Sequence, residues 1–252
     1  MLVKEFKADN LTVKKYDSRA AMGRAAGEEA AEHFRKLIAE KGDIWVIFAA
    51  APSQNEFLST LAESDIPWNK VHAIHMDEYV DLPADHPAGF GNFLDRAIFK
   101  KVPFASVDYM TTTKTPEQIV QDYTRLLGEH HIDICLMGIG ENGHIAFNDP
   151  HVADFADPAK IKKVDLDLKC RTQQVHDGCF ASLDQVPKYA MTLTIPTLFA
   201  CDRLFCVVPA ATKADAVKAT VTGPVSEVCP ASILRRHAAA TLYVDSDSGK
   251  FI

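Results

Sequence analysis

A glycine-rich loop at residues 138–150 carries the side chains whose types and spacing best suit chemistry. It directly follows the apolar run 132–137, which predicts a buried strand. Its glycines free the backbone for a tight turn and for close approach to a ligand. Within it, Asn142, His144 and Asp149 offer an amide, an imidazole and a carboxylate. This set could move protons, since open α/β sheets bind ligands at such strand ends. The alternative is that these side chains only cap a strand-to-loop turn.

Two adjacent carboxylates, Asp77 and Glu78, follow the predicted strand at 70–76. At the carboxyl end of a parallel strand, partial desolvation can raise the pKa of such a group toward that of a useful general base. Alternatively, either carboxylate caps the following turn or pairs with a surface cation. His72 and His75 are three residues apart and therefore point to opposite faces of the strand, so we expect no metal site there.

Four further residues could hold an anionic group. Lys213 lies where a predicted helix begins after the strand at 203–209, and the amino end of a helix attracts anions. Arg171 stands close to two amides in the run Arg-Thr-Gln-Gln. Ser53 and Gln54 occupy a strand-to-helix turn, where they could cradle a phosphate or only cap the helix. Because that turn matches neither nucleotide-binding fingerprint, we expect no nucleotide cofactor.

The elements that must position these residues alternate between strands and helices. This alternation predicts one three-layer α/β domain with a largely parallel sheet. Strands are expected at 43–51, 70–76, 132–137, 190–196, 203–209 and 239–245. Helices are expected at 18–41, 56–63, 92–100, 115–129 and 212–220, and the polar stretch 151–169 is expected to be irregular.

Composition narrows the partners and the compartment. Of the 252 residues, 47% are hydrophobic and 24% charged, as in ordinary globular proteins. The net charge of −7 argues against a nucleic-acid partner. Six cysteines without a Cys-x-x-Cys pair look like free thiols of a reducing compartment. With no signal peptide or membrane-spanning stretch visible, we expect a cytoplasmic protein that does not bind membranes.

Taken together, the motifs resemble the glucosamine-6-phosphate deaminase (isomerase) family, whose superfamily also holds 6-phosphogluconolactonases. The similarity runs from about residue 10 to 245. Its most specific parts are Met76-Asp-Glu-Tyr-Val-x-Leu-Pro83 with His86-Pro87, Gly140-x-Asn-Gly-His-Ile-Ala-Phe-Asn148 and Val186-Pro-Lys-Tyr-Ala190. The resemblance implies a Rossmann-like three-layer sandwich in a single domain over 1–252, with no organic cofactor. It also implies conversion of an amino-sugar phosphate to a keto-sugar phosphate and ammonia.

The resemblance further implies a role for each site residue. Asp77 falls on the base that moves a proton between C2 and C1, and His144 on the residue that assists ring opening. Asn142 falls on a catalytic position where many members have Asp, and Asp149 falls on one where the family usually has Glu. Lys213 falls on a ligand of the substrate phosphate. The remaining expected substrate contacts are Glu78, Ser53, Gln54, Gly143 and Arg171.

The chain departs from the family pattern at the phosphate. Ala50, Ala51 and Pro52 stand where typical deaminases place glycines and a threonine, and proline removes a backbone donor. The usual phosphate-binding arginine is absent near Asp177, so Arg171 is expected to replace it. These departures indicate a divergent member whose substrate could be another hexosamine phosphate.

Two other functions stay open. Lactone hydrolysis would need His144 to activate water and would leave Asp77 less central. A non-enzymatic sugar-phosphate sensor would tolerate loss of Asp77, which is present, and the chain has no helix-turn-helix segment. In every case the partner is a small sugar phosphate, and a homo-oligomer is open because relatives range from monomers to hexamers.

Overall fold

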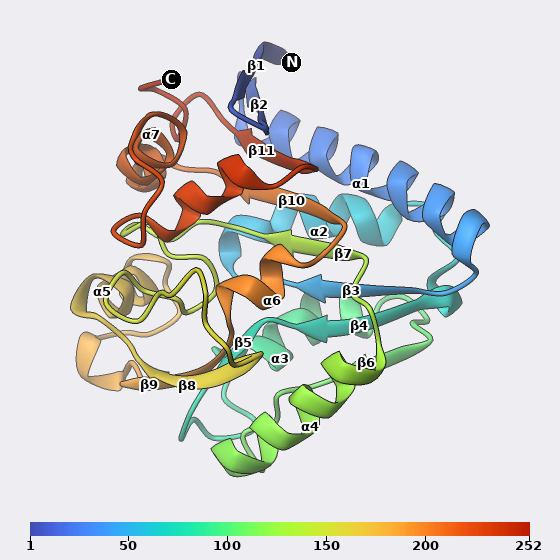
Figure 1. Ribbon diagram of the computed structural model, residues 1–252, viewed down its shortest axis with the longest axis vertical. Coiled ribbons are helices and arrows are strands. Elements are labelled where there is room, and N and C mark those ends of the chain that lie inside the picture. Colours follow the sequence, from blue (N-terminus) through green and yellow to red (C-terminus); the bar gives the residue numbers. More distant parts are fainter.

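The computed structural model describes residues 1–252 and is built on an eight-stranded sheet with helices on both faces (Figure 1). From edge to edge the strands are β1 (Leu2–Ala8), β2 (Leu11–Tyr16), β11 (Ala240–Val244), β10 (Arg203–Val208), β7 (Ile134–Met137), β3 (Ile44–Phe48), β4 (Val71–His75) and β6 (Ser106–Asp108). All neighbours run parallel except β1 and β2, which form an antiparallel hairpin. The expected largely parallel α/β sheet is therefore confirmed.

Side chains on the two faces of the sheet pack into two separate hydrophobic cores. The sheet and the helices on its two faces therefore form three layers. The helices are α1 (Arg19–Lys41), α2 (Asn55–Glu63), α3 (Phe90–Leu94), α4 (Pro116–Glu129), α5 (Leu168–His176), α6 (Ile195–Phe199) and α7 (Ala214–Thr222). On β3, Val46 and Phe48 join the core that contains residues of α1, α2 and α3, whereas Ile47 joins the core with residues of α4, α6 and α7. Successive residues of a strand point to opposite faces, so one short apolar run serves both cores.

Three strands lie outside this sheet. β5 (Asp77–Tyr79), β9 (Tyr189–Leu193) and β8 (Ile161–Asp165) form a small antiparallel sheet below the main one (Figure 1). The strand predicted at 190–196 is β9 of this sheet and not part of the parallel one. The prediction that residues 151–169 are irregular was wrong over Ile161–Asp165, where β8 lies. With only two apolar residues in Ile-Lys-Lys-Val-Asp, β8 gives a weak strand pattern, and its pairing with β9 holds it.

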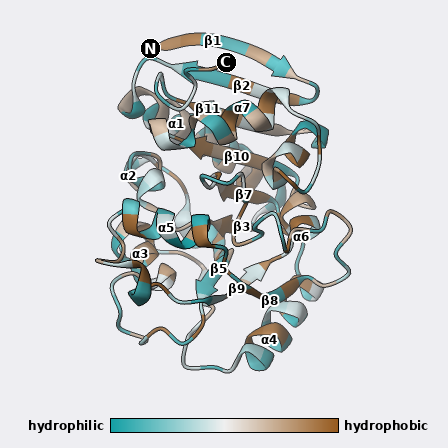
Figure 2. Ribbon diagram, turned by 90° about the vertical axis from the view of Figure 1, so that its left-hand side faces the viewer, coloured by the Kyte–Doolittle hydropathy of each residue, from teal (hydrophilic) through white to brown (hydrophobic).

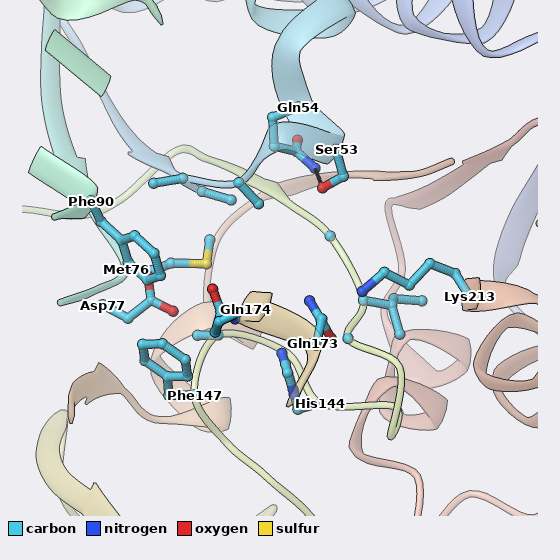
Figure 3. Close-up of a pocket in the computed structure, with 17 residues that line it drawn as sticks. Ser53, Gln54, Met76, Asp77, Phe90, His144, Phe147, Gln173, Gln174 and Lys213 are labelled. Atoms are coloured by element: carbon cyan, nitrogen blue, oxygen red, sulfur yellow. Dashed lines mark hydrogen bonds between the residues drawn. The ribbon is translucent and has the colours of Figure 1, made fainter. Parts of the chain in front are cut away.

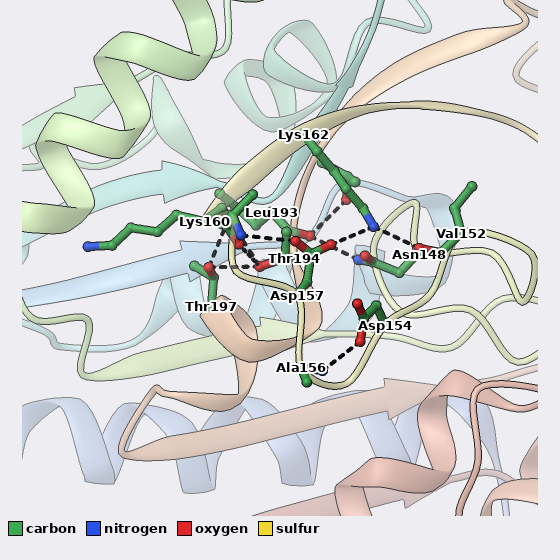
Figure 4. Close-up of polar contacts among 12 residues, drawn as sticks. Asn148, Val152, Asp154, Ala156, Asp157, Lys160, Lys162, Leu193, Thr194 and Thr197 are labelled. Carbon is green, nitrogen blue, oxygen red and sulfur yellow. Dashed lines mark hydrogen bonds and ion pairs between the residues drawn. The ribbon is translucent and has the colours of Figure 1, made fainter.

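Polar contacts fix the chain between the glycine-rich loop and β8 (Figure 4). Asn148 donates its amide to the carbonyls of Ile145 (3.0 Å) and Leu193 (2.9 Å), which ties the end of the loop to β9. Lys162 donates to Asp157 and to the Val152 carbonyl, both at 2.7 Å. The loop that carries His144 follows β7 of the main sheet and is anchored by Asn148 to β9 of the small sheet.

A side-chain cap marks the start of helix α4, which was expected at 115–129. Thr115 accepts from the Gln118 N–H and the Gln118 side chain accepts from the Thr115 N–H, with Pro116 in the first helical position. The helix expected at 92–100 begins earlier as α3 and ends in a π-helical turn, Asp95–Phe99. Helix α5 was missed because its apolar residues follow no helical period; Asp167 caps it.

Apolar residues concentrate on the central strands, and hydrophilic residues on the outer turns of the helices (Figure 2). Both ends of the chain lie beside the β1–β2 hairpin in this view. None of the helices combines the length and apolar character that crossing a membrane would require.

Candidate active site

A cavity opens at the carboxyl ends of the four central strands β4, β3, β7 and β10 (Figure 3). Each strand sends one loop into it, as expected for an open parallel sheet. Five residues singled out in the sequence line this cavity: Ser53, Gln54, Asp77, His144 and Lys213. They are separated by up to 160 positions in the chain, and the strand order alone brings them together.

Asp77 stands directly after β4 and begins β5. Its carboxylate faces the cavity, is only 6% exposed, and accepts no hydrogen bond from the protein. Burial, and then the neighbouring charge of Glu78, hold the pKa of Asp77 well above its usual range. The site therefore contains a desolvated carboxyl group of unusual basicity.

The buried ring of His75 fixes the backbone that carries Asp77. Its Nε2 accepts from the Met110 N–H at 2.9 Å, so the proton lies on Nδ1, which donates to the Asp77 carbonyl at 2.8 Å. Burial lowers the pKa of His75 to about 4, which keeps the ring neutral. His75 thus positions Asp77 without adding a charge to the cavity.

His144 is oriented from behind by Asp149 and Asn142. The Nδ1 atom of His144 lies 2.9 Å from Asp149 Oδ1, and its Nε2 faces the cavity (Figure 3). Asn142 donates to the same Asp149 oxygen at 2.9 Å and accepts from the His144 N–H at 3.0 Å. Burial alone would raise the pKa of Asp149, but the contacts with His144, Asn142 and the Asp167 N–H lower it. Asp149 is thus an ionised partner for the imidazole.

Two glycines of the loop are required by close approach. A Cβ atom on Gly140 would lie 2.2–2.4 Å from the His144 ring, so only glycine leaves room for that ring. Gly143 has a φ of +87°, and its Cβ would lie 2.8 Å from the Cys229 sulfur. Ala146, which lines the cavity, has a φ of +47°, a conformation that costs free energy in a residue with a side chain.

Lys213 brings a positive charge to the other side of the cavity from Asp77 (Figure 3). It closes the 3-10 turn Ala211–Lys213 that leads into α7, and only 4% of it is exposed. No carboxylate forms an ion pair with its ammonium group. Burial lowers the pKa of Lys213, and the charges of Asp177 and Glu141 only partly oppose this shift. The cavity therefore presents an unpaired cation to a ligand.

Ser53 and Gln54 lie above the cavity, at the turn between β3 and α2 (Figure 3). Gln54 is buried and donates to the Val207 carbonyl at 3.1 Å and to the Ser53 hydroxyl oxygen at 3.3 Å. Gln54 therefore joins β3 to β10 and holds the Ser53 hydroxyl at the cavity wall.

The other expected site residues do not line the cavity. Asn142 and Asp149 stand behind His144, as described, and Gly143 packs against Cys229. Glu78 accepts three backbone N–H groups, from Tyr79, Phe90 and Gly91, at 2.9–3.0 Å, and so ties β5 to α3. Arg171 donates to the carbonyls of Leu183 and Val186. Its guanidinium fixes a loop, and it is not placed as the substitute phosphate ligand.

Sequence reasoning missed two glutamines. Gln173 and Gln174 both line the cavity and both come from α5 (Figure 3). In the sequence they appear only as amides next to Arg171, and no apolar period revealed the helix that turns them toward the cavity. Sequence reasoning also missed three apolar residues of the cavity wall, Met76, Phe90 and Phe147. They line the cavity on the side where Asp77 lies.

One group beside the cavity has the composition of a metal site. The ligand atoms of His144, Asp149 and Cys170 lie within 4.8 Å of one another. Both Asp149 oxygens already face donors from the protein, however, and burial raises the pKa of the Cys170 thiol well above its usual range. This donor set suits the orientation of His144 better than it suits a cation.

Comparison with known proteins decides the family. The model of the family described as glucosamine-6-phosphate isomerases/6-phosphogluconolactonase matches residues 17–243. The chain belongs to this family. Its relatives include the glucosamine-6-phosphate deaminase of Streptococcus gordonii, 33% identical over 88% of this chain and 92% of that protein. The Streptococcus pneumoniae deaminase is 30% identical over 79% of this chain and 84% of that protein.

Solved structures of family members share the fold. A monomeric glucosamine-6-phosphate deaminase superimposes with a TM-score of 0.86 at 24% identity, over 95% of this chain and 99% of that one. The 6-phosphogluconolactonase of Thermotoga maritima gives a TM-score of 0.75 at 20% identity, over 92% and 98% of the two chains. The Rossmann-like three-layer sandwich expected from the sequence is thereby confirmed.

Proposed function

We propose that this enzyme converts glucosamine-6-phosphate, or a closely related hexosamine phosphate, into the matching ketose phosphate and ammonia. One observation carries the proposal: a buried carboxylate and a buried ammonium, neither paired by the protein, face the same cavity from different sides. Unpaired buried charges are costly, so a ligand that satisfies both explains their presence. The deaminase names of the relatives support the substrate class.

Asp77 serves as the base in this proposal. Isomerisation removes a proton from C2 and delivers one to C1, and a single carboxylate above the C1–C2 bond can do both. The raised pKa of Asp77 makes it a stronger base than an exposed aspartate, and the apolar Met76, Phe90 and Phe147 around it keep water from competing.

His144 serves in ring opening. The sugar ring opens when its oxygen gains a proton and the anomeric hydroxyl loses one, and an imidazole can transfer both. Nδ1 faces Asp149, 2.9 Å from its Oδ1, so Nε2 is the atom that meets the substrate. Once isomerisation has turned C2 into a carbonyl-level carbon, addition of water releases the amino group as ammonia.

Lys213 and Ser53 hold the phosphate in this proposal. The Lys213 ammonium supplies charge and the Ser53 hydroxyl supplies a donor, and Pro52 removes one backbone N–H from the turn. No organic cofactor has a part in these steps. Glu78 and Arg171, which were expected to contact substrate, are left out because their atoms are engaged elsewhere.

The experiment measures ammonia release and ketose-phosphate formation from glucosamine-6-phosphate and, in parallel, galactosamine-6-phosphate. Release by the wild type that collapses in Asp77→Asn supports deamination with Asp77 as base, and the preferred epimer names the substrate. No release from either sugar overturns the proposal. Hydrolysis of 6-phosphogluconolactone, assayed alongside, tests the lactonase alternative, in which His144 activates water; sugar-phosphate binding without turnover would indicate a sensor.

We further propose that residues 1–252 act as a single sugar-phosphate isomerase/deaminase domain, that the enzyme works in the cytoplasm, and that it can form homo-oligomers. Sedimentation in the presence and absence of the sugar phosphate tests the last of these.

A further inference from the structure

Of the three glutamines that line the cavity, Gln174 is the one whose side chain makes no hydrogen bond within the protein. Only 6% of it is exposed, yet its side-chain amide makes no hydrogen bond to any other residue. Gln174 extends from α5 and lines the same cavity as Asp77 (Figure 3). An amide that reaches the cavity without a protein partner keeps its donor and its acceptor available to a ligand.

The neighbouring glutamine provides the contrast. Gln173 comes from the same helix and lines the same cavity, but its amide oxygen accepts from the Glu141 N–H at 2.8 Å and its nitrogen donates to Asp177 at 3.3 Å. Its amide oxygen therefore holds the glycine-rich loop to α5, and its nitrogen contacts the residue that follows that helix. In Gln174 neither the oxygen nor the nitrogen has a partner in the protein.

The position of Gln174 indicates which part of a sugar it meets. Under the proposed function, C1 and C2 lie at Asp77 and the phosphate on C6 lies at Lys213, so C3 and C4 lie between. Gln174 lines the same cavity as these two residues and lies between them in the view of Figure 3. An amide, which both donates and accepts, suits a pair of neighbouring hydroxyls. A positive charge there would instead suit an anion.

We infer that Gln174 is a specificity-determining residue that binds the C3 and C4 hydroxyls of the sugar phosphate. This inference rests on the proposed function. It makes the site sensitive to the configuration of these carbons, because a buried amide rejects a substrate that leaves it unpaired much more strongly than an apolar wall does.

The test is a cycle between Gln174 and substrate hydroxyls. For the wild type and Gln174→Met, which keeps the volume but removes the polar atoms, kcat/KM is measured with glucosamine-6-phosphate and its 3-deoxy and 4-deoxy analogues. We expect at least one analogue to lose about 30-fold with the wild type and about threefold or less with the variant. Gln173→Ala is the control, and it should change kcat/KM by the same factor for all three sugars relative to the wild type. An unchanged melting temperature shows that Gln174→Met folds.

Equal losses with the wild type and Gln174→Met for both analogues would overturn the inference. Failure of the proposed function looks different, since the wild type then releases no ammonia from the intact sugar. In that event the same cycle is run on calorimetric binding of the three sugar phosphates, where coupling supports the role of Gln174 and its absence refutes it.

Discussion

At the scale of single residues, Asp77 combines burial with the lack of any partner, and this predicts a gain of stability on its removal. Its raised pKa means that the folded state holds the proton more tightly than the unfolded chain, so the wild type loses stability as the pH rises above 3.8. Asp77→Asn is therefore expected to lose about 1000-fold in kcat but to have a higher free energy of unfolding than the wild type at pH 7. The stability difference should shrink at pH 4. Thermal unfolding at both pH values checks this, and equal or lower stability at pH 7 would contradict it.

The same argument applies to Lys213, whose buried and unpaired group is a cation. Burial lowers its pKa, so its charged form costs stability throughout the neutral range, and this cost disappears as the pH rises toward 10.5. Lys213→Met is expected to raise the melting temperature at pH 7 and to abolish stabilisation by inorganic phosphate. Scanning both proteins with 0 and saturating phosphate checks this; an equal phosphate-induced shift in the variant would show that the anion binds elsewhere.

At the scale of elements, the glycine-rich loop works only if its backbone passes close under the His144 ring. Gly140→Ala would place a methyl group within 2.4 Å of that ring, which must then leave the cavity. We expect a loss of about 100-fold or more in kcat/KM with the fold retained. Gly128→Ala is the control: it lies in helix α4 with its nearest neighbour at 3.9 Å, so activity should persist and stability should rise by up to about 1 kcal/mol. Full activity of Gly140→Ala would exclude this account of the loop.

At the scale of the whole molecule, the carboxyl ends of the parallel strands carry the site, whereas residues at their amino ends stabilise the fold. Asp133 stands at the amino end of β7, away from the site, where it accepts from Lys41 at 2.6 Å and from the Trp45 N–H at 2.8 Å. Asp133→Ala leaves the half-buried Trp45 N–H without this acceptor and removes the contact with Lys41, and we expect a loss of about 2 kcal/mol in unfolding free energy. Below the melting temperature kcat/KM should match the wild type. Urea unfolding and ammonia assays on one preparation test both statements.

Much of this arrangement was predictable from short stretches of sequence. The buried runs of β3, β7 and β10 and the glycine-rich loop are local patterns, and each predicted its element correctly. Asp77, His144 and Lys213 lie in the segments that follow β4, β7 and β10, and the carboxyl ends of parallel strands lie on one side of the sheet. The sequence therefore determined the fold class and the residues that face one another across the cavity.

The remaining features depend on contacts between distant segments, and only the tertiary structure decided them. β8 is too polar to be predicted alone, and it exists because β9 offers a partner. Glu78 looks catalytic by sequence, yet three N–H groups of β5 and α3 engage it. Gln174 looks like a surface amide until α5 turns it toward Asp77. The physical reason is the same in each case: whether a polar side chain serves structure or substrate depends on which donors and acceptors surround it, and those come from elsewhere in the chain.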